Sequence, residues 1–473
     1  MALAASQQAT RTTGHNKALV LITTSLGVLI AQIDTSVVNL AVKHIGADLH
    51  AGLTSLQWVV DIYNLAYASL LLTAGTLADL YGRRRLFALG IALFTVGSLA
   101  CGLAPNTPML IAGRAVAGIG AALEIPTSLA ILTVAFRDTK ERTRALGIWA
   151  SCNGLAFIIG PTLGGVLVDI AGWRSVFLLI VPVSMLALVL TFTSIPESRD
   201  PSGRRLDVPG QGLAIAALGT LSLAVIEGPR WGWSSTSSIL SFAISIGAAL
   251  LFLRRQAGVA GALVPLSLFR NRVFSACLAI AGCMTFGMYA MLFLTPLYLQ
   301  AARGNSALIT GIQLLPMSLA FVIVSQWSGK IANDIGPRVP MALGMALMGS
   351  GLVILALIPL NDSLVLIEAA LLIIGCGLGL NTGPVNSVAV ANVSVQRAGT
   401  ASGLVNTARM IGATLGVAAL GAVFAIFSQT QSGIVSGLAP AFIGGAIAEF
   451  FGAAVALVFI RRDSLDLGHK AGA

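Results

Sequence analysis

The sequence has few charged residues for its length. Only 10% of its 473 residues are Asp, Glu, Lys or Arg, and 56% are hydrophobic, whereas a soluble globular protein carries about 25% charged residues. The mean hydropathy is +0.90. Because so few charged residues cannot cover the surface of a soluble fold, we expect most of the surface to face lipid.

Cysteines and catalytic motifs are also scarce. The five cysteines lie in apolar stretches and none has the spacing of metal ligands, so we expect buried thiols, no metal and no cofactor. The sequence has no phosphate-binding loop and no nucleophile motif, which argues against an enzyme. The net charge is +10, but the basic residues lie between apolar stretches, which argues against a nucleic-acid-binding domain.

Long apolar stretches dominate the sequence instead. A helix needs about 20 apolar residues to cross a bilayer, and by this criterion the sequence predicts an all-α polytopic membrane protein. The first stretch follows a polar segment without a small-residue cleavage site, so we expect it to be retained. The fourteen predicted spans are 18–40, 54–79, 84–104, 107–135, 143–168, 173–195, 209–229, 237–256, 273–298, 308–331, 338–359, 363–390, 400–428 and 437–460.

The basic residues indicate an orientation. An even number of spans places both termini on one side, and cytoplasmic loops are enriched in Lys and Arg. With cytoplasmic termini, 22 of the 28 Lys and Arg residues are cytoplasmic, including Arg11, Arg204, Arg205 and Lys470. We therefore expect both termini in the cytoplasm.

One turn between two predicted spans carries an unusual set of residues. In Gly75–Gly90 (GTLADLYGRRRLFALG), Asp79 closes one helix, Gly82 permits a tight turn, and Arg83, Arg84 and Arg85 open the next helix. Three arginines place this turn on the cytoplasmic side.

A degenerate copy of this turn, Gly329–Arg338 (GKIANDIGPR), follows 254 residues later. Two copies predict a duplicated architecture. We expect an N-terminal six-helix bundle in 1–200, an inserted helix pair in 201–260 and a C-terminal six-helix bundle in 261–473.

Ionisable groups inside a membrane are costly and are therefore functional candidates. The predicted spans contain Asp34, Asp61, Arg114 and Glu124. From a rise of about 1.5 Å per residue, the first three lie about 10 Å below the outer surface and can pair, and Glu124 lies about 15 Å deeper than Arg114.

Each of these groups also has a structural interpretation. Asp34 and Asp61 can be headgroup-level residues that reach water, Arg114 can be an ion-pair partner only, and Glu124 can form a fixed internal hydrogen bond. Glu368 and Arg409 lie closer to the ends of their spans, and we interpret both as structural.

The fifth span contains Gly160, Pro161, Gly164 and Gly165. Pro161 removes a helical hydrogen bond, and the glycines let a neighbouring backbone approach closely. Simple helix packing is the alternative explanation.

These motifs resemble those of the major facilitator superfamily, and in particular its fourteen-helix drug:proton antiporter branch. The arginine-rich turn resembles motif A, Arg114 with Gly118 resembles motif B, and the fifth-span glycines resemble the antiporter motif C of exporters. The segments Asp34–Asn39, Trp173–Arg174 and Gly403–Arg409 also resemble that branch. Ala117, where Gln is common, and Glu124, at a position that is usually apolar, depart from the pattern.

The resemblance implies a proton-coupled antiporter that exports amphipathic or cationic drugs or antibiotics across the bacterial cytoplasmic (inner) membrane by alternating access. It implies proton coupling through Asp34, Asp61, Arg114 and Glu124. The residues expected to control the conformational change are Gly75, Asp79, Gly82, Arg83, Arg84, Gly160, Pro161, Gly164 and Gly165.

Substrate recognition is expected to use apolar and aromatic surface. A cavity with aromatic walls and carboxylates favours a lipophilic cation, and Arg114 leaves room for zwitterions or anions. The partners expected are a drug or antibiotic, protons and the bilayer, with the protein a monomer. The candidate walls, any of which can be ordinary packing, are Tyr63, Trp149, Phe157, Phe286, Tyr289, Phe293 and Asn406.

Two alternatives stay open from the sequence. The first is a dedicated exporter of a single metabolite or self-made antibiotic, which a resistance panel compared with transport of single compounds would distinguish. The second is a non-transporting membrane receptor or scaffold, which would show no substrate-dependent proton flux in proteoliposomes.

Overall fold

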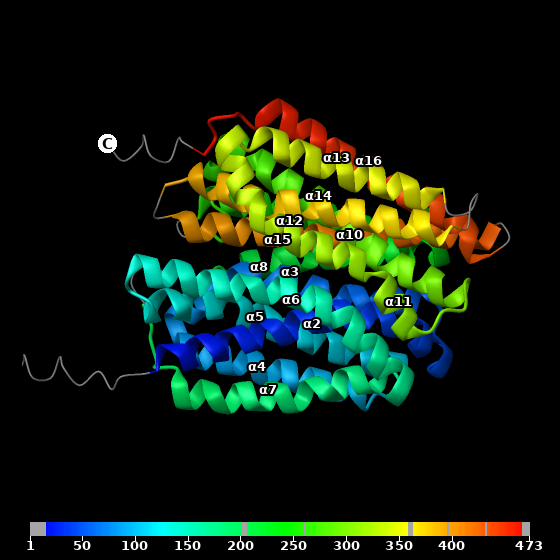
Figure 1. Ribbon diagram of the computed structural model, residues 1–473, viewed down its shortest axis with the longest axis horizontal. Helices are drawn as coiled ribbons and strands as arrows, with labels where there is room; N and C mark the ends of the chain where they lie inside the picture. Colours follow the sequence, from blue (N-terminus) through cyan, green and yellow to red (C-terminus); the bar gives the residue numbers. More distant parts are fainter. Residues whose placement is uncertain are drawn as a thin grey trace, which may run out of the picture.

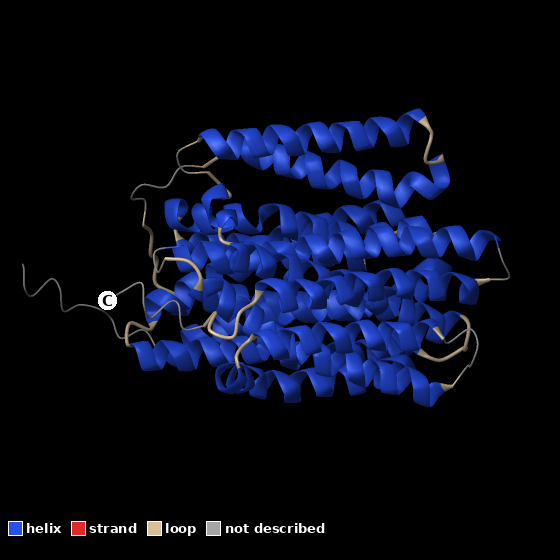
Figure 2. Cartoon of the chain, turned by 90° about the horizontal axis from the view of Figure 1, so that it is seen from above, coloured by secondary structure: helices blue, strands red, loops and turns tan. Residues whose placement is uncertain are grey.

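The computed structural model describes residues 16–200, 206–259, 262–357, 363–394, 397–430 and 433–465. Its regular structure there is helical throughout, with loops gathered at two ends of the molecule (Figure 2). Arg11, Arg204, Arg205, Lys470 and the predicted domain boundary at 260–261 lie outside the described residues.

The helices form two halves, one above the other in Figure 1. The lower half contains α2 (Lys17–Asp48), α3 (Leu53–Tyr81), α4 (Arg83–Gly102), α5 (Thr107–Ala135), α6 (Thr139–Ala171) and α7 (Arg174–Ser194). The upper half contains α10 (Arg272–Ala301), α11 (Ala307–Gln313), α12 (Leu315–Ile335), α13 (Arg338–Ala356), α14 (Leu364–Ala391), α15 (Ala398–Thr430) and α16 (Ile434–Phe459). We call α2–α7 the first bundle and α10–α16 the second bundle.

Thirteen helical segments of the described chain are long and apolar enough to cross a membrane. The protein is therefore a multi-pass membrane protein. α3 has 29 residues but is not among the thirteen, because Gln57, Asp61 and Asn64 lower its hydropathy. The count of fourteen spans stays a prediction.

The predicted span 308–331 is interrupted in the structure. A seven-residue helix, α11, ends at Gln313, and α12 starts at Leu315. Pro316 explains the break, because its nitrogen has no hydrogen to donate to Ile312 O and its ring would clash with that carbonyl. The Leu314 amide instead donates to Thr310 O and Gly311 O, each at 3.2 Å.

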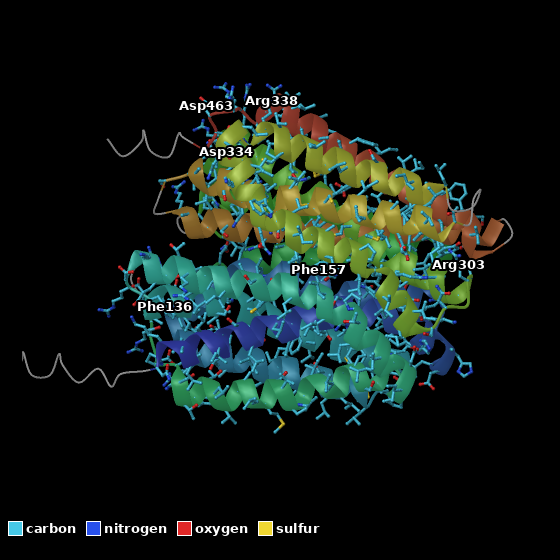
Figure 3. The ribbon with its side chains drawn as sticks, viewed as in Figure 1. Phe136, Phe157, Arg303, Asp334, Arg338 and Asp463 are labelled. Carbon is cyan, nitrogen blue, oxygen red and sulfur yellow. The ribbon has the colours of Figure 1, made fainter. Side chains whose placement is uncertain are left out.

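The helix ends define two ends of the molecule. α2 begins and α16 ends at the left of Figure 1, and we call this the proximal end and the opposite one the distal end. Figure 3 places Asp334, Arg338 and Asp463 at the proximal end and Arg303 at the distal end.

Glycines bring α4 and α5 into close contact. A Cβ at Gly97 would lie 2.7 Å from Gly113 O, and one at Gly120 would lie 2.7 Å from Gly90 O. Small residues that let membrane helices approach in this way are a main source of their association. This contact fixes α5, which carries Arg114 and Glu124, within the first bundle.

The pair α8 (Val208–Trp231) and α9 (Thr236–Gly258) is bonded to α3 at two levels. At the distal end, Trp58 Nε1 donates to Glu227 Oε1 at 3.0 Å. Nearer the proximal end, the Gln211 amide donates to Ser69 O at 2.6 Å. These bonds attach α8 to the first bundle.

Asp207 joins the proximal ends of α8 and α9. It caps α8 through Gly210 N and accepts from Arg255 Nε at 2.6 Å. Burial raises the pKa of Asp207, but the hydrogen bonds from Arg255, Gly210 and Gln256 outweigh it, so this pKa lies below its usual value. The carboxylate is therefore ionised and holds the two helix ends together.

The α4–α5 contact predicts a stability effect. Gly120→Ala should lower the unfolding free energy by about 1–3 kcal/mol, because the added methyl group meets backbone atoms of α4. Gly219→Ala in α8 is the control, since a Cβ there has no neighbour within 4 Å. Thermal unfolding in detergent measures both, and equal stability of the two variants would contradict the close contact.

Candidate functional site

A buried ion pair lies in the first bundle. Arg114 Nη1 of α5 donates to Asp34 Oδ2 of α2, and their side chains are only 2% and 1% exposed. Arg114 Nε donates to Val59 O of α3 at 3.1 Å. Arg114 therefore joins three helices. The pairing that the sequence allowed for Asp34 is present in the structure.

Tyr63 completes the surroundings of this pair. Its ring centroid lies 4.3 Å from Arg114 Cζ, and its hydroxyl donates to Ala31 O at 3.3 Å. A guanidinium over an aromatic face gains a cation–π interaction. Tyr63 is only 1% exposed, so in this conformation it packs against the ion pair.

Asp61 is buried but does not join the pair. It is fully buried, and neither carboxylate oxygen has a hydrogen-bond partner in the described chain. One turn earlier on the same face of α3, the Gln57 amide donates to Val417 O of α15 at 3.4 Å. Asp61 thus lies on the face of α3 that packs against the second bundle.

Glu124 is also buried without a hydrogen-bond partner for either oxygen. A Cβ placed on Gly27 of α2 would collide with Glu124 Oε1, and one on Gly90 of α4 would lie 2.9 Å from Glu124 N. The carboxyl group of Glu124 therefore packs against α2, and its backbone packs against α4, in the interior of the first bundle.

Glu449 of α16 is a third such acid, which the sequence analysis did not select. It is fully buried, and both of its oxygens lack partners among the described residues. A Cβ on Gly287 of α10 would lie 2.7 Å from Glu449 Oε1. The sequence could have identified Glu449, because it is an acidic residue inside the predicted span 437–460.

The arginine-rich turn contains an ion pair, Asp79 Oδ1 with Arg83 Nη2 at 2.7 Å. Its other partner is Glu197, which follows α7 and accepts from the amides of Arg84 and Arg85 at 3.1 and 3.3 Å. A carboxylate at the start of a helix satisfies free amides and the helix dipole. The turn is thus bonded to the end of its own bundle.

Gly82 is required for this arrangement for two reasons. Its φ is +108°, and a Cβ there would lie 2.6 Å from Glu197 Oε1. In the second copy, Gly336 has φ +86°, and a Cβ would lie 2.6 Å from Arg462 Cγ. Each turn therefore packs against the residue three positions beyond the last helix of its bundle. By contrast, Gly75 has no neighbour within 4 Å of a Cβ.

The glycines of α6 pack against both bundles. A Cβ on Gly160 would collide with Ser36 Oγ, and one on Gly164 would lie 2.9 Å from Val37 Cγ1, both on α2. Two further contacts join α6 to α11 of the second bundle. A Cβ on Gly165 of α6 would lie 2.6 Å from Leu308 Cα of α11, and a Cβ on Gly311 of α11 would collide with Pro161 O of α6.

Hydrogen bonds join the two bundles at the distal end. Asp169 at the end of α6 accepts from the amides of Ala307 and Leu308, both at 3.0 Å, and so caps α11. Lys43 Nζ of α2 donates to Gln300 O of α10 at 2.8 Å. The distal end is therefore closed in this conformation. The sequence analysis did not single out Asp169.

The predicted substrate walls divide into two groups. Tyr63, Tyr289 and Phe293 are at most 8% exposed. Trp149, Phe157, Phe286 and Asn406 are partly exposed. Phe157 lies between the two halves in Figure 3, and its ring contacts that of Phe321 in α12 at 5.4 Å.

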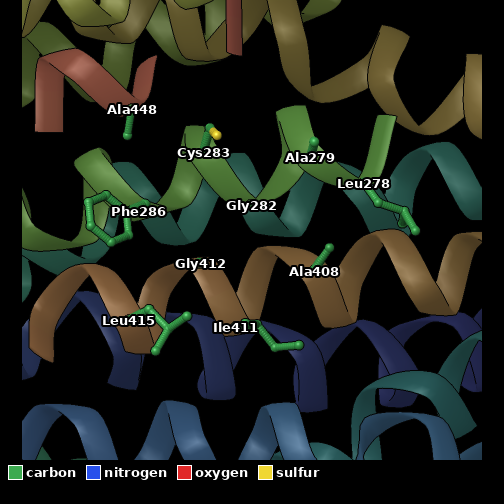
Figure 4. A pocket seen from close by; sticks show the side chains of 10 residues that line it. All are labelled: Leu278, Ala279, Gly282, Cys283, Phe286, Ala408, Ile411, Gly412, Leu415 and Ala448. Carbon is green, nitrogen blue, oxygen red and sulfur yellow. The ribbon is translucent and has the colours of Figure 1, made fainter. Parts of the chain in front are cut away.

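A groove of about 360 Å³ lies between α10, α15 and α16 (Figure 4). Apolar side chains line it, including Phe286, Cys283 and Leu415. Among the predicted substrate walls, Phe286 lines this groove. Glu449 follows Ala448 of the lining in the sequence but is not itself part of the lining.

The buried pair predicts a large effect on stability. Asp34→Asn should cost about 3–5 kcal/mol, because it leaves Arg114 charged and buried without its partner. Asp48→Asn is the control, since the Asp48–Arg174 pair has half-exposed side chains and such pairs contribute at most about 1 kcal/mol. Thermal unfolding in detergent compares them, and losses of similar size would contradict the role of burial.

Comparison with known proteins identifies the family. The Major Facilitator Superfamily model matches residues 24–417. The chain is 40% identical over 407 residues to "Multidrug resistance protein Stp" of Mycobacterium tuberculosis, covering 86% of this chain and 76% of that protein. It is 35% identical over 430 residues to "Methylenomycin A resistance protein" of Bacillus subtilis, covering 90% and 91%.

The fold also matches a solved structure. The crystal structure of a D-xylose-proton symporter superposes with a TM-score of 0.68 at 13% sequence identity, covering 94% of this chain and 98% of that one. At this identity the likeness concerns the fold alone. Together with the family match, it leads to one conclusion: the chain belongs to the major facilitator superfamily.

Proposed function

We propose that this protein is a proton-coupled antiporter that exports amphipathic or cationic drugs or antibiotics by alternating access. The observation that carries the proposal is the buried Asp34–Arg114 pair with two further unpartnered acids, Asp61 and Glu124, in the same bundle. Ionisable groups in a membrane interior are retained where they move protons or bind substrate. Relatives named for multidrug and antibiotic resistance support the same function.

The proposed topology has fourteen spans, with α3 as the fourteenth and α8–α9 inserted between two six-helix bundles. The proximal end is assigned to the cytoplasm and the distal end to the exterior of a bacterial inner membrane. The basic turn at Arg83–Arg85 supports this assignment through the positive-inside rule. We further propose that the protein acts as a monomer.

The conformation then corresponds to a state closed toward the exterior. The bonds of Asp169 and Lys43 across the bundles support this assignment. For outward opening these bonds must break and the α6 glycines must separate from α11. The Asp79–Arg83 turn and Glu197 would control the opposite, cytoplasmic end.

Proton coupling is assigned to Asp34 or Glu124. A proton from the exterior would neutralise the carboxyl group and release the substrate. Loss of that proton to the cytoplasm would restore the charge and allow substrate to bind again. Protonation of Asp34 would also release Arg114 from its ion pair, which couples the proton to the α2–α5 contact.

A second candidate is a dedicated exporter of one compound. It is favoured by the relative that is named for resistance to a single antibiotic, methylenomycin A. A panel of unrelated compounds distinguishes the two: a dedicated exporter would protect cells against one member, and a multidrug exporter against several.

Efflux of a lipophilic cation from cells tests the proposed function. We expect wild-type efflux to stop when a protonophore is added, and Asp34→Asn or Glu124→Gln to reduce it at least tenfold. Glu141→Gln is the control, because Glu141 is half exposed and pairs with Lys17 outside the apolar interior. Normal efflux by both variants would show that neither acid carries the proton, and efflux insensitive to the protonophore would refute proton coupling.

A further inference from the structure

Arg409 of α15 is a partly exposed cation between apolar helices, and no carboxylate of the described chain balances its charge. Its Nη2 donates to Thr382 O of α14 at 2.9 Å, and its Nε is buried without a hydrogen-bond partner. Within the described part of the chain, no carboxylate forms a salt bridge with it. Arg114, the buried arginine of the first bundle, has Asp34.

The uncompensated charge of Arg409 cannot be removed by a change of protonation. A buried acid without a partner can take up a proton and become neutral, whereas an arginine in a protein keeps its charge. Because Arg409 Nε is buried, the charge of the guanidinium is costly unless an anion compensates it. The carbonyl of Thr382 satisfies one N–H group but supplies no negative charge.

One phenol group from each bundle interacts with the charge of Arg409. Electrostatic interactions connect Arg409 with Tyr289 of α10 and with Tyr67 of α3, and Tyr67 also with Glu124. Neither phenol hydroxyl donates a hydrogen bond within the described residues. Arg409, Tyr289 and Tyr67 thus provide unused donors on the two sides of the bundle interface.

The backbone around Arg409 borders incompletely filled space. Residues 406–411 of α15 are all partly exposed, whereas Ala413 and Thr414 one turn later are buried. Asn406 precedes Arg409 by three residues and so lies on the same face of the helix. A ligand near Arg409 would therefore also reach an amide side chain.

We propose that Arg409, with Tyr67 and Tyr289, binds the anionic oxygen of an amphipathic substrate, such as a carboxylate or an ionised phenol. The inference rests on the proposed export function and narrows its substrate class. Compounds that carry an acidic group are then substrates alongside cations, and Arg409 is a binding residue rather than the structural residue that the sequence indicated.

Two dyes with the same xanthene ring system and opposite charge test the site. Fluorescein is an anion and a rhodamine ethyl ester is a cation. Fluorescence anisotropy measures the binding of each to purified protein in detergent. We expect Arg409→Gln to weaken fluorescein binding at least tenfold and to leave rhodamine ester binding within twofold, and Arg409→Lys to retain part of the fluorescein affinity.

Arg397→Gln is the matched control, because Arg397 precedes the same helix, is exposed, and donates to Ser267 Oγ at 2.8 Å. It should bind both dyes like wild type. Equal loss of both dyes in Arg409→Gln, or no fluorescein binding by wild type, would overturn the proposal. If Arg409→Gln does not fold, Arg409→Lys is the deciding variant. Because lysine keeps the positive charge, complete loss of fluorescein binding in Arg409→Lys, with rhodamine ester binding retained, would also contradict a charge-based site.

Transport is measured separately in inverted vesicles. If wild-type protein shows no proton-dependent transport of the rhodamine ester, the export function is refuted, and the fluorescein-binding result is not affected. Intact rhodamine ester transport with unaltered fluorescein binding in Arg409→Gln would refute only the anion site.

Discussion

Charge in a membrane interior has to be compensated, and this constraint governs the arrangement of the first bundle. Asp34 and Arg114 are each almost fully buried, so either one alone would cost several kcal/mol. Their contact requires α2 and α5 to meet, and the Val59 carbonyl brings in α3. The glycine contacts between α4 and α5 keep α5 in place. The ion pair thus joins three helices, and the glycine contacts add α4 to them.

The other buried ions follow the same constraint by different routes. Asp61, Glu124 and Glu449 lack partners, and an acid can meet the constraint by binding a proton. Arg409 has no such route, and we propose that a ligand compensates its charge. The first bundle balances its arginine internally and the second does not. In the function proposed above, this division would separate acids that exchange protons from an arginine that binds an acidic substrate.

Much of the fold could be predicted from sequence, because apolar length decides which segments span a bilayer. The break at Leu314 needed the local effect of Pro316 on a continuous apolar stretch, and α3 was harder because its polar residues resemble a loop in hydropathy. For the site, the similar depths of Asp34 and Arg114 in the membrane correctly predicted that the two residues can pair. Depth alone could not exclude Asp61, because the side of α3 that faces α5 depends on helix rotation. Likewise, the open environment of Arg409 depends on how α15 packs between α3, α10 and α14.

The two copies of the arginine-rich turn show how a duplicated structure can diverge in its response to the surroundings. Gly82 packs against the Glu197 carboxylate, which binds the start of α4 through charge and is partly exposed. Gly336 packs against the aliphatic part and backbone of Arg462. Salt weakens exposed charge interactions but not van der Waals contacts. At the proximal end, the contact of the first bundle is therefore sensitive to ionic strength and to anionic lipid headgroups, whereas the equivalent contact of the second bundle is not.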